Sequence, residues 1–484
     1  MTHNAANAAP TEYVAQEWQQ SVMPTLHDYI RIPNKSPMFD PEWEQRGEMQ
    51  RAAELLFTWA SARQINGMQI SIEQLPGRTP VLFIEIAASG DTTQTSSEAA
   101  TVLLYGHYDK QPEFDGWHAG LSPWEPVERD GKLYGRGGAD DGYALFASLL
   151  SIEAIQQQGG HHPRCVVLIE GCEESGSFDL PFYVDHLRGR IGQAKLVICL
   201  DAECGNYDQL WVTTSLRGML PGVLSVDILT EGQHSGSAGG IVPSSFRILR
   251  DLLGRIENSA SGALHPSLHT DIPTAAINAA QEVAQVLGPQ ISQRFPWTDG
   301  AGPDQDDMAQ LLISNAWEPS LATVALGGFP DMQDAGNTLR PGTQAKLVFR
   351  LPPTVDADLA ATEIKAILEQ DPPYGARVQF SLETPQTGWC APIMADWLEH
   401  ALQQASLNAF GKPAMQMGMG GTIPFMKMLG DAYPSTQFFV TGVLGPQSNA
   451  HGPNEFLHIE TAKRLTCIVS EVLQATYRQW RDAE

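Results

Sequence analysis

Residues 101–112 read TVLLYGHYDKQP and place a histidine and an aspartate directly after a run of apolar residues. The apolar run carries no charge, which predicts a strand that is buried on both faces. The pattern returns in residues 164–177, which read RCVVLIEGCEESGS, and in residues 195–204, which read KLVICLDAEC. Such strands are typical of a sheet that is covered by helices on both sides.

The neighbouring segments extend this sheet and then depart from it. Residues 81–87 predict a further strand, and residues 143–156 predict a helix with Ala, Leu and Ile on one face. Beyond about residue 210 the strands alternate apolar and polar side chains, which indicates a sheet with one face in solvent. The elements expected there are strands at 222–229, 322–326, 345–351 and 378–382 and a helix at 245–256.

The C-terminal part returns to the first pattern. Pro392 predicts the first turn of a helix, residues 437–443 predict a buried strand, and residues 460–477 predict a last helix. We therefore expect an α/β fold with a doubly wound mixed sheet, interrupted by an inserted α+β domain. The expected boundaries are residues 1–212 and 390–484 for the α/β domain and residues 213–389 for the insert.

Composition narrows the classes of partner. The 484-residue chain has a net charge of −26, a field that repels nucleic acid and anionic membrane, so we expect neither as a partner. No apolar run approaches the length of a membrane span, and residues 1–16 lack the basic and apolar regions of a signal peptide. The six cysteines form no C-x-x-C pair, which predicts reduced thiols and a cytoplasmic location.

Acids and histidines follow several of the predicted strands. They are His107, Asp140, Glu173, Glu174, Asp201 and His451. Each has an ordinary alternative when taken alone: a structural histidine, a helix-capping aspartate or a solvated pair of glutamates. Because the carboxyl ends of strands share one edge of an α/β sheet, we expect them to converge there. Carboxylates and imidazoles together suit Zn²⁺, Mn²⁺ or Co²⁺, and the sequence therefore predicts a metal site.

The order and spacing of five motifs resemble the M20 metallopeptidases, and within them the carnosinase-type dipeptidases. The motifs are GHYDKQP at 106–112, DGW at 115–117, DGKLYGRG at 130–137, EGCEESGS at 170–177 and QHSG at 233–236. The resemblance runs from about residue 15 to the end of the chain. It implies a catalytic domain with two divalent metal ions, Zn²⁺ first among the candidates, and an inserted lid and dimerisation domain.

The resemblance also implies a role for each site residue. His107 and Asp201 correspond to ligands of one metal, Glu174 and His451 to ligands of the other, and Asp140 to the carboxylate that bridges them. Glu173 corresponds to the general base, and Asp109 to the acid that orients the His107 ring. His234 and Asn337 correspond to groups that reach the active site of a partner subunit, so a homodimer is expected. The implied substrate-binding residues are Asn337, Arg350, Gly420, Gly421 and Thr422.

The implied reaction is hydrolysis of dipeptides or short peptides with a free carboxylate, in which a hydroxide shared by the metals attacks and Glu173 moves the proton. Two alternatives stay open: an N-acyl-amino-acid amidohydrolase with the same metals, and a non-catalytic binding protein on this fold.

Two positions depart from the family pattern. Gly142 stands where the family usually has Lys, and Gly418–Met419 stands where the dipeptidase branch often has Arg–Glu.

Overall fold

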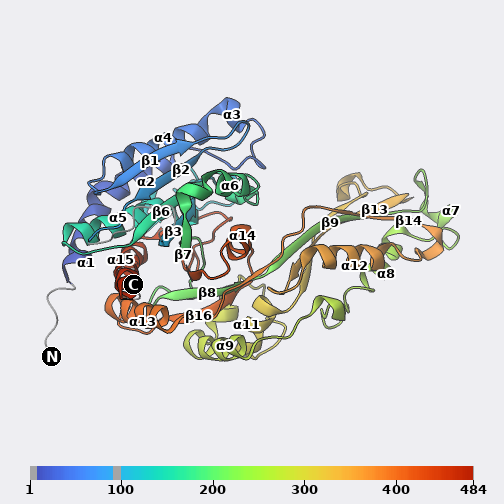
Figure 1. Ribbon diagram of the computed structural model, residues 1–484. Coiled ribbons are helices and arrows are strands. Elements are labelled where there is room, and N and C mark those ends of the chain that lie inside the picture. The colour runs from blue at the N-terminus through green and yellow to red at the C-terminus, as the bar shows by residue number, and fades with distance from the viewer. Residues whose placement is uncertain (1–7, 91–99, 483–484) are drawn as a thin grey trace.

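The computed structural model describes residues 8–90 and 100–482 (Figure 1). Residues 1–7, on which part of the signal-peptide expectation rests, lie outside the described residues. None of the described helices is long and apolar enough to cross a membrane. The molecule has two parts, a layered α/β unit and an elongated unit that reaches away from it along β9 and β13 (Figure 1).

A six-stranded mixed sheet organises the α/β unit. Its strand order is β1-β2-β6-β3-β7-β17. The strands β6, β3, β7 and β17 run parallel, whereas β1 and β2 pair antiparallel at one edge. This arrangement confirms the expected fold class. The bounds are β1 Met68–Glu73, β2 Val81–Ile86, β3 Ala100–His107, β6 Arg164–Glu170, β7 Gln193–Cys199 and β17 Gln437–Val440.

Helices cover both faces of this sheet, because alternate side chains of each strand point to opposite sides. In β3, Val102 and Leu104 pack into the larger core, whereas Leu103 and Tyr105 pack into a second core on the other face. The larger core receives α1 (Ala8–Glu17), α2 (Met23–Ile30), α4 (Glu48–Ser61), α5 (Ala144–Gln157), α13 (Asp396–Phe410) and α15 (Ile459–Arg481). The second core receives α6 (Leu180–Ile191) and α14 (Pro424–Ala432).

The elongated unit is an antiparallel sheet with helices on one face. The strand order is β11-β13-β9-β14. A core forms between β9, β13, α8 and α12, and β11 at the edge is largely exposed. The bounds are β9 Gly218–Asp227, β11 Ser320–Gly327, β13 Gly342–Leu351, β14 Arg377–Leu382, α8 Ser245–Leu253 and α12 Ala357–Glu369.

A small sheet of order β15-β8-β16 joins the two units, and two helices of the insert pack on it. We did not predict these helices, α9 and α11, whose apolar residues pack against Trp211, Met415 and each other. The bounds are β8 Trp211–Leu216, β15 Trp389–Cys390, β16 Met415–Met419, α9 Thr274–Leu287 and α11 Met308–Trp317. Two minor sheets combine β4 (Val127–Arg129) and β5 (Lys132–Tyr134) with β18 (Phe456–His458), and β10 (Gln233–His234) with β12 (Thr338–Leu339).

Element ends differ from the sequence prediction at two places in the C-terminal part. The helix predicted to begin at Pro392 begins at Asp396, because Ala395 is extended and its N–H donates to the Gln437 side chain. The strand predicted over 437–443 ends at Val440. Gly442 then passes so close to the Ala202 main chain that a side chain would not fit there.

Candidate metal centre

The carboxyl ends of the parallel strands carry the predicted site residues. His107 is the last residue of β3, Asp201 lies two residues beyond the end of β7, and Glu173–Ser175 form a 3-10 turn, η3, just beyond β6. Asp140 lies in a short turn, η2 (Gly138–Gly142), whose backbone is non-helical at Asp140 and Asp141 and which leads into α5. The peptide bond between Asp140 and Asp141 is cis, as the family resemblance implies.

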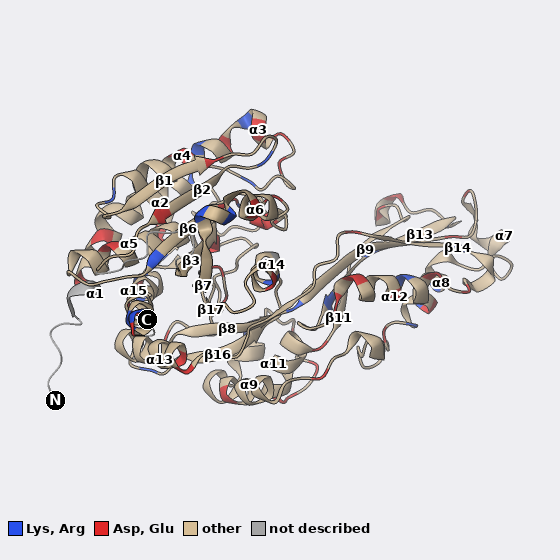
Figure 2. Ribbon diagram, viewed as in Figure 1, with Lys and Arg blue, Asp and Glu red and all other residues tan. Residues whose placement is uncertain are grey.

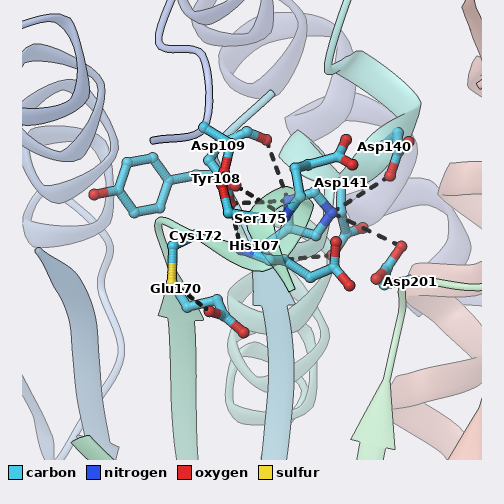
Figure 3. A network of polar contacts seen from close by, with 12 residues as sticks. His107, Tyr108, Asp109, Asp140, Asp141, Glu170, Cys172, Ser175 and Asp201 are labelled. Carbon is cyan, nitrogen blue, oxygen red and sulfur yellow. Dashed lines mark hydrogen bonds and ion pairs between the residues drawn. The ribbon is translucent and has the colours of Figure 1, made fainter. Parts of the chain in front are cut away.

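The structure brings the five predicted ligands into two groups that share one residue. His107, Asp140 and Asp201 form the first group, and Asp140, Glu174 and His451 form the second. Within each group, the candidate ligand atoms lie within 4.8 Å of one another. Figure 3 shows the His107 ring directed at the carboxylates of Asp140 and Asp201. Two cation sites bridged by the Asp140 carboxylate are the arrangement that this geometry can hold.

Atoms at the centre of the cluster lack ordinary partners. His107 Nε2 lies 3.4 Å from Asp140 Oδ1, and His451 Nε2 lies 3.1 Å from Asp140 Oδ2. Yet His107 Nε2 and Asp140 Oδ2 are buried and form no hydrogen bond of acceptable geometry among the described residues. Buried polar atoms without partners are costly, and divalent cations would satisfy them. The donor set of carboxylates and imidazoles fits such ions.

The charges of the cluster also favour a cation. Burial alone would lower the pKa of His107, but the facing carboxylates of Asp109 and Asp140 and the charge of Asp201 raise it well above its usual range. Burial, with the nearby charges of Asp140 and Glu174, raises the pKa of Asp201 to about 7. Acids that are crowded away from water retain protons unless a positive charge compensates them, and metal ions supply that charge.

Asp109 connects the two sides of the site. Its Oδ1 lies 3.4 Å from His107 Nδ1. The same carboxylate accepts the main-chain N–H groups of Glu173 at 3.1 Å and of Glu174 at 3.0 Å. Asp109 therefore fixes the His107 ring and also holds the η3 turn in place, a second task that the sequence did not indicate. One buried side chain thus sets the relative positions of three others.

Two further residues of the site were missed in the sequence. Asp141 is buried, and its Oδ2 accepts the main-chain N–H of His107 at 3.2 Å. Gln111 donates its side-chain amide to Glu174 Oε2 at 2.6 Å, which orients that carboxylate. Gln111 lies within the motif GHYDKQP, so its place beside the strand end was a usable signal. The contact of Asp141 depends on the η2 turn, and no signal in the sequence indicated it.

A buried ion pair supports the loop that carries His451. Arg136 Nη1 donates to Glu455 Oε2 at 2.6 Å, and Arg136 Nη2 donates to the carbonyl of Gly452. Glu455 in turn accepts the N–H of Gly137, which adjoins the η2 turn. The loop needs this support because His451 itself has a left-handed backbone, with φ of 62°. The ion pair therefore couples the position of His451 to that of Asp140.

Glu173 is placed beside the cluster but belongs to neither ligand group. It follows Cys172 in the η3 turn, and its neighbour Glu174 is a member of the second group. Burial and the nearby charge of Asp201 hold the pKa of Glu173 well above its usual range. A carboxyl group with a raised pKa holds a proton more readily than an ordinary carboxyl group, which suits a group that must accept a proton and release it again.

The predicted substrate-binding residues lie in two separate places. Arg350, near the end of β13, donates to Thr422 Oγ1 at 3.0 Å, and Thr422 follows Gly420 and Gly421 between β16 and α14. His234 and Asn337 instead lie together at the far end of the elongated unit, where β10 pairs with β12 beside α7 (Ser235–Ala238; Figure 1). Within one chain, neither His234 nor Asn337 reaches the metal cluster.

Comparison with known families agrees with this geometry. The model of Peptidase family M20/M25/M40 matches residues 103–475, which span every candidate metal ligand. The chain belongs to this peptidase family. Membership confirms the resemblance seen in the motifs, and it implies divalent metal ions in the site that the five side chains form.

Similar proteins are dipeptidases by name. This M20 peptidase is 26% identical to the cysteinylglycine-S-conjugate dipeptidase of Corynebacterium striatum over 381 residues, covering 76% of this chain and 80% of that protein. It is 24% identical to the beta-Ala-His dipeptidase of Homo sapiens, covering 94% and 91%. The structure of human carnosine dipeptidase 1 aligns with a TM-score of 0.76 at 22% identity, covering 97% and 99%. These folds confirm the architecture.

The two departures from the family motifs have steric explanations in this M20 peptidase. A Cβ atom at Gly142 would lie 2.3 Å from the Tyr29 ring and 2.5 Å from the carbonyl oxygen of Gly137. A Cβ atom at Gly418 would lie 2.5 Å from Ser215 Oγ and 2.9 Å from the Ala316 side chain of α11. Neither position has room for a side chain, so the changes follow local packing.

Glu170 gives a prediction about pH and stability. Burial raises its pKa to about 7, although Tyr105 and Ser177 donate hydrogen bonds to it. An acid whose pKa is higher in the folded chain stabilises the fold at low pH, and this contribution is lost as the pH rises through the folded pKa. The Gln side chain of Glu170→Gln stays neutral at every pH. We therefore expect the unfolding free energy of this variant, relative to that of the wild type, to rise by about 1–3 kcal/mol as the pH increases from 5 to 8.

Urea unfolding at constant metal content measures this difference. Gln keeps the carbonyl oxygen that Tyr105 and Ser177 contact and loses the weak contact from Cys172 Sγ to Oε2, so the change with pH reports the charge. The control is Glu282→Gln on the exposed side of α9, whose stability should follow the wild type at every pH. A Glu170→Gln difference that does not change with pH would show that this carboxyl titrates normally.

Proposed function

We propose that the protein is a dinuclear metal-dependent dipeptidase that hydrolyses dipeptides or short peptides with a free carboxylate. The observation that carries this proposal is the sharing of Asp140 by two ligand groups at one sheet edge, with Glu173 beside them. The dipeptidase names of similar proteins support the substrate class. A shared carboxylate between two cations is a common device for hydrolysing amide and ester bonds.

The five side chains of the two groups would hold the ions, for which we propose Zn²⁺, with Mn²⁺ and Co²⁺ as alternatives. When bound, such ions activate water and polarise the carbonyl of the scissile peptide bond. The chain supplies the proton transfers: Glu173 takes a proton from the attacking water and later delivers it to the departing amine. Asp109 keeps Glu173 in position through its main-chain N–H.

Arg350 and Thr422 would bind the free carboxylate of the substrate. The Arg350 guanidinium can form a bidentate pair with a carboxylate, and Thr422 already orients it through a hydrogen bond at 3.0 Å. Gly420 and Gly421 place main-chain atoms beside this position without side chains in the way.

Metal content gives the first test. We expect two divalent ions per chain after chelation and refilling, because each ligand group is complete. Asp140→Asn should lose both ions, whereas His451→Ala should lose mainly one, since His451 belongs to one group only. Elemental analysis by mass spectrometry counts them, with Asp431→Asn, an exposed residue paired with Lys427, as the control. A wild type that is fully active with one ion or none contradicts the proposal.

Substrate class gives the second test. The metal-loaded protein should hydrolyse a panel of dipeptides faster than the N-acetyl forms of the same C-terminal amino acids. Faster hydrolysis of the N-acetyl compounds would assign the protein to the amidohydrolases instead. If protein that carries both ions hydrolyses neither set of compounds, the remaining candidate is a binding function.

The elongated unit would serve as lid and dimerisation domain. We propose residues 213–389 for this domain and residues 1–212 and 390–484 for the catalytic domain. The edge strand β11 supports a homodimer, because its backbone is unpaired on one side and Val324 and Leu326 are 56% and 54% exposed. His234 and Asn337, which lie far from their own metal cluster, would then complete the partner's site. Cys165, Cys172, Cys199, Cys204 and Cys390 form no disulfide bond, which supports our proposal of a cytoplasmic location.

A further inference from the structure

Two arginines near the loop of Gly420–Thr422 have no acidic partner. Arg217, between β8 and β9, is only 7% exposed, and Arg350 on β13 is half-buried. Among the described residues, neither guanidinium has a carboxylate within ion-pair distance, although the chain has 56 acidic and 30 basic residues. Basic residues appear in blue where β8 continues into β9 (Figure 2). Buried charges of one sign that lack a counter-ion are uncommon in a folded chain.

The contacts of Arg217 leave part of its guanidinium without a partner. Nε donates to the carbonyl of Gly420 at 3.2 Å, and Nη1 donates to Ser320 Oγ at 3.0 Å and to the carbonyl of Glu318 at 3.3 Å. Nη2 forms no hydrogen bond among the described residues. A Cβ atom at Gly420 would lie 3.0 Å from Nη2 and 2.9 Å from the side-chain amide of Asn315, so this nitrogen and that amide border the same glycine.

Arg217 and Arg350 border the same loop. Thr422 Oγ1 accepts a hydrogen bond from Arg350 Nη1 and donates one to the carbonyl of Arg217 at 2.6 Å. The two positive charges disfavour each other: burial, and then the charge of Arg350, lower the pKa of Arg217 to about 10. An anion between them would relieve both the repulsion and the loss of hydration. One carboxylate occupies Arg350 in the proposed function, which leaves Arg217 for another.

We propose that Arg217 is a specificity-determining residue that binds a second carboxylate of the substrate. The substrates that fit are dipeptides with a C-terminal Asp or Glu, whose α-carboxylate pairs with Arg350 and whose side-chain carboxylate pairs with Arg217. This inference rests on the proposed function, because it takes the loop as the carboxylate subsite. The competing explanation is that Arg217 only fixes the loop through Gly420 and Thr422.

Matched substrates separate these explanations. The kcat/KM values of the metal-loaded protein are compared for Ala-Glu and Ala-Gln, which differ in charge but hardly in size. We expect the wild type to prefer Ala-Glu by about 10- to 100-fold, the effect of one charge-assisted hydrogen bond in a buried site. Arg217→Gln should bring this ratio close to one, and Arg217→Lys should keep part of it. Arg377→Gln, which changes an exposed arginine on β14, is the control and should keep the full ratio.

A binding measurement tests the inference without turnover. Titration calorimetry of the metal-loaded protein with L-glutamate and L-glutamine, the C-terminal products, should show the same preference and its loss in Arg217→Gln. Equal affinity of the wild type for both, or an equal fall for both in Arg217→Gln, would overturn the inference and leave Arg217 as a loop support. Failure of the proposed function looks different, because then no dipeptide is cleaved whatever the preference in binding.

Discussion

Replacing Glu173 with Gln is expected to lower kcat by about 10²–10⁴-fold, the usual contribution of one general base. The carboxylate lies beside both ligand groups but in neither, so the variant should retain two metal ions per chain. Gln has the size and the hydrogen-bonding carbonyl of Glu but cannot accept a proton at neutral pH. The loss should therefore appear in kcat, whereas KM for a dipeptide changes little.

The control variant should change a glutamate that lies near the same strand ends but has no part in the mechanism. Glu203 lies two residues beyond Asp201, is partly exposed and pairs with Arg294 at 3.6 Å. Glu203→Gln should keep wild-type kcat and metal content. Elemental analysis and steady-state kinetics on both variants give the answer. Near-normal turnover in Glu173→Gln would refute its role as base, and loss of a metal ion would show that it is a ligand.

Much of the catalytic unit could be predicted because its signals are local. Buried parallel strands such as 164–170 are continuous apolar runs, and the residue after each run lies at the carboxyl edge of the sheet by topology alone. This reasoning brought His107, Asp201 and Glu174 to one edge before any distance was known. The same reasoning brought His451 to this edge from the strand predicted at 437–443, although the loop between them has no periodic signal and the backbone of His451 is left-handed.

The remaining features depend on contacts between distant segments. The ion pair between Arg136 and Glu455 joins residues that are 319 positions apart, and no local pattern indicates it. Arg217 was not singled out in the sequence, and the surrounding structure is what shows that it lacks an acidic partner among the described residues. The helices α9 and α11 were missed because their apolar residues pack on the joining sheet around Trp211 and Met415, a surface that exists only after the chain has folded.

A second large effect is expected at His234, which lies far from every metal ligand of its own chain (Figure 1). Its Nδ1 accepts the N–H of Gly236 at 3.1 Å, so the opposite side of the exposed ring is free to donate a hydrogen bond. If it stabilises the oxyanion in a partner's site, His234→Ala should lower kcat by about 10²–10³-fold, the effect of one oxyanion donor. Metal content should stay at the wild-type value.

Mixing two inactive variants tests whether this histidine acts across a dimer. His234→Ala has a native metal site but lacks the histidine, whereas Glu173→Gln has the histidine but lacks the base. In a two-fold dimer formed from one chain of each, one of the two sites receives both native groups. After random exchange of subunits half of the dimers are mixed, so activity should return to about a quarter of the wild-type value.

The alternative arrangements give different results. If His234 acted within its own chain, every site in the mixture would lack one group, and no activity would return. If His234 had no catalytic part, His234→Ala would be active alone and mixing would add nothing. Asn337→Ala should behave like His234→Ala, since Asn337 precedes Thr338, the strand partner of His234, and its side chain would enter the same partner site. Light scattering at assay concentration gives a further check. If the protein is monomeric and still fully active, a partner does not supply His234. Because His234 also lies far from the metal cluster of its own chain, it would then have no part in catalysis.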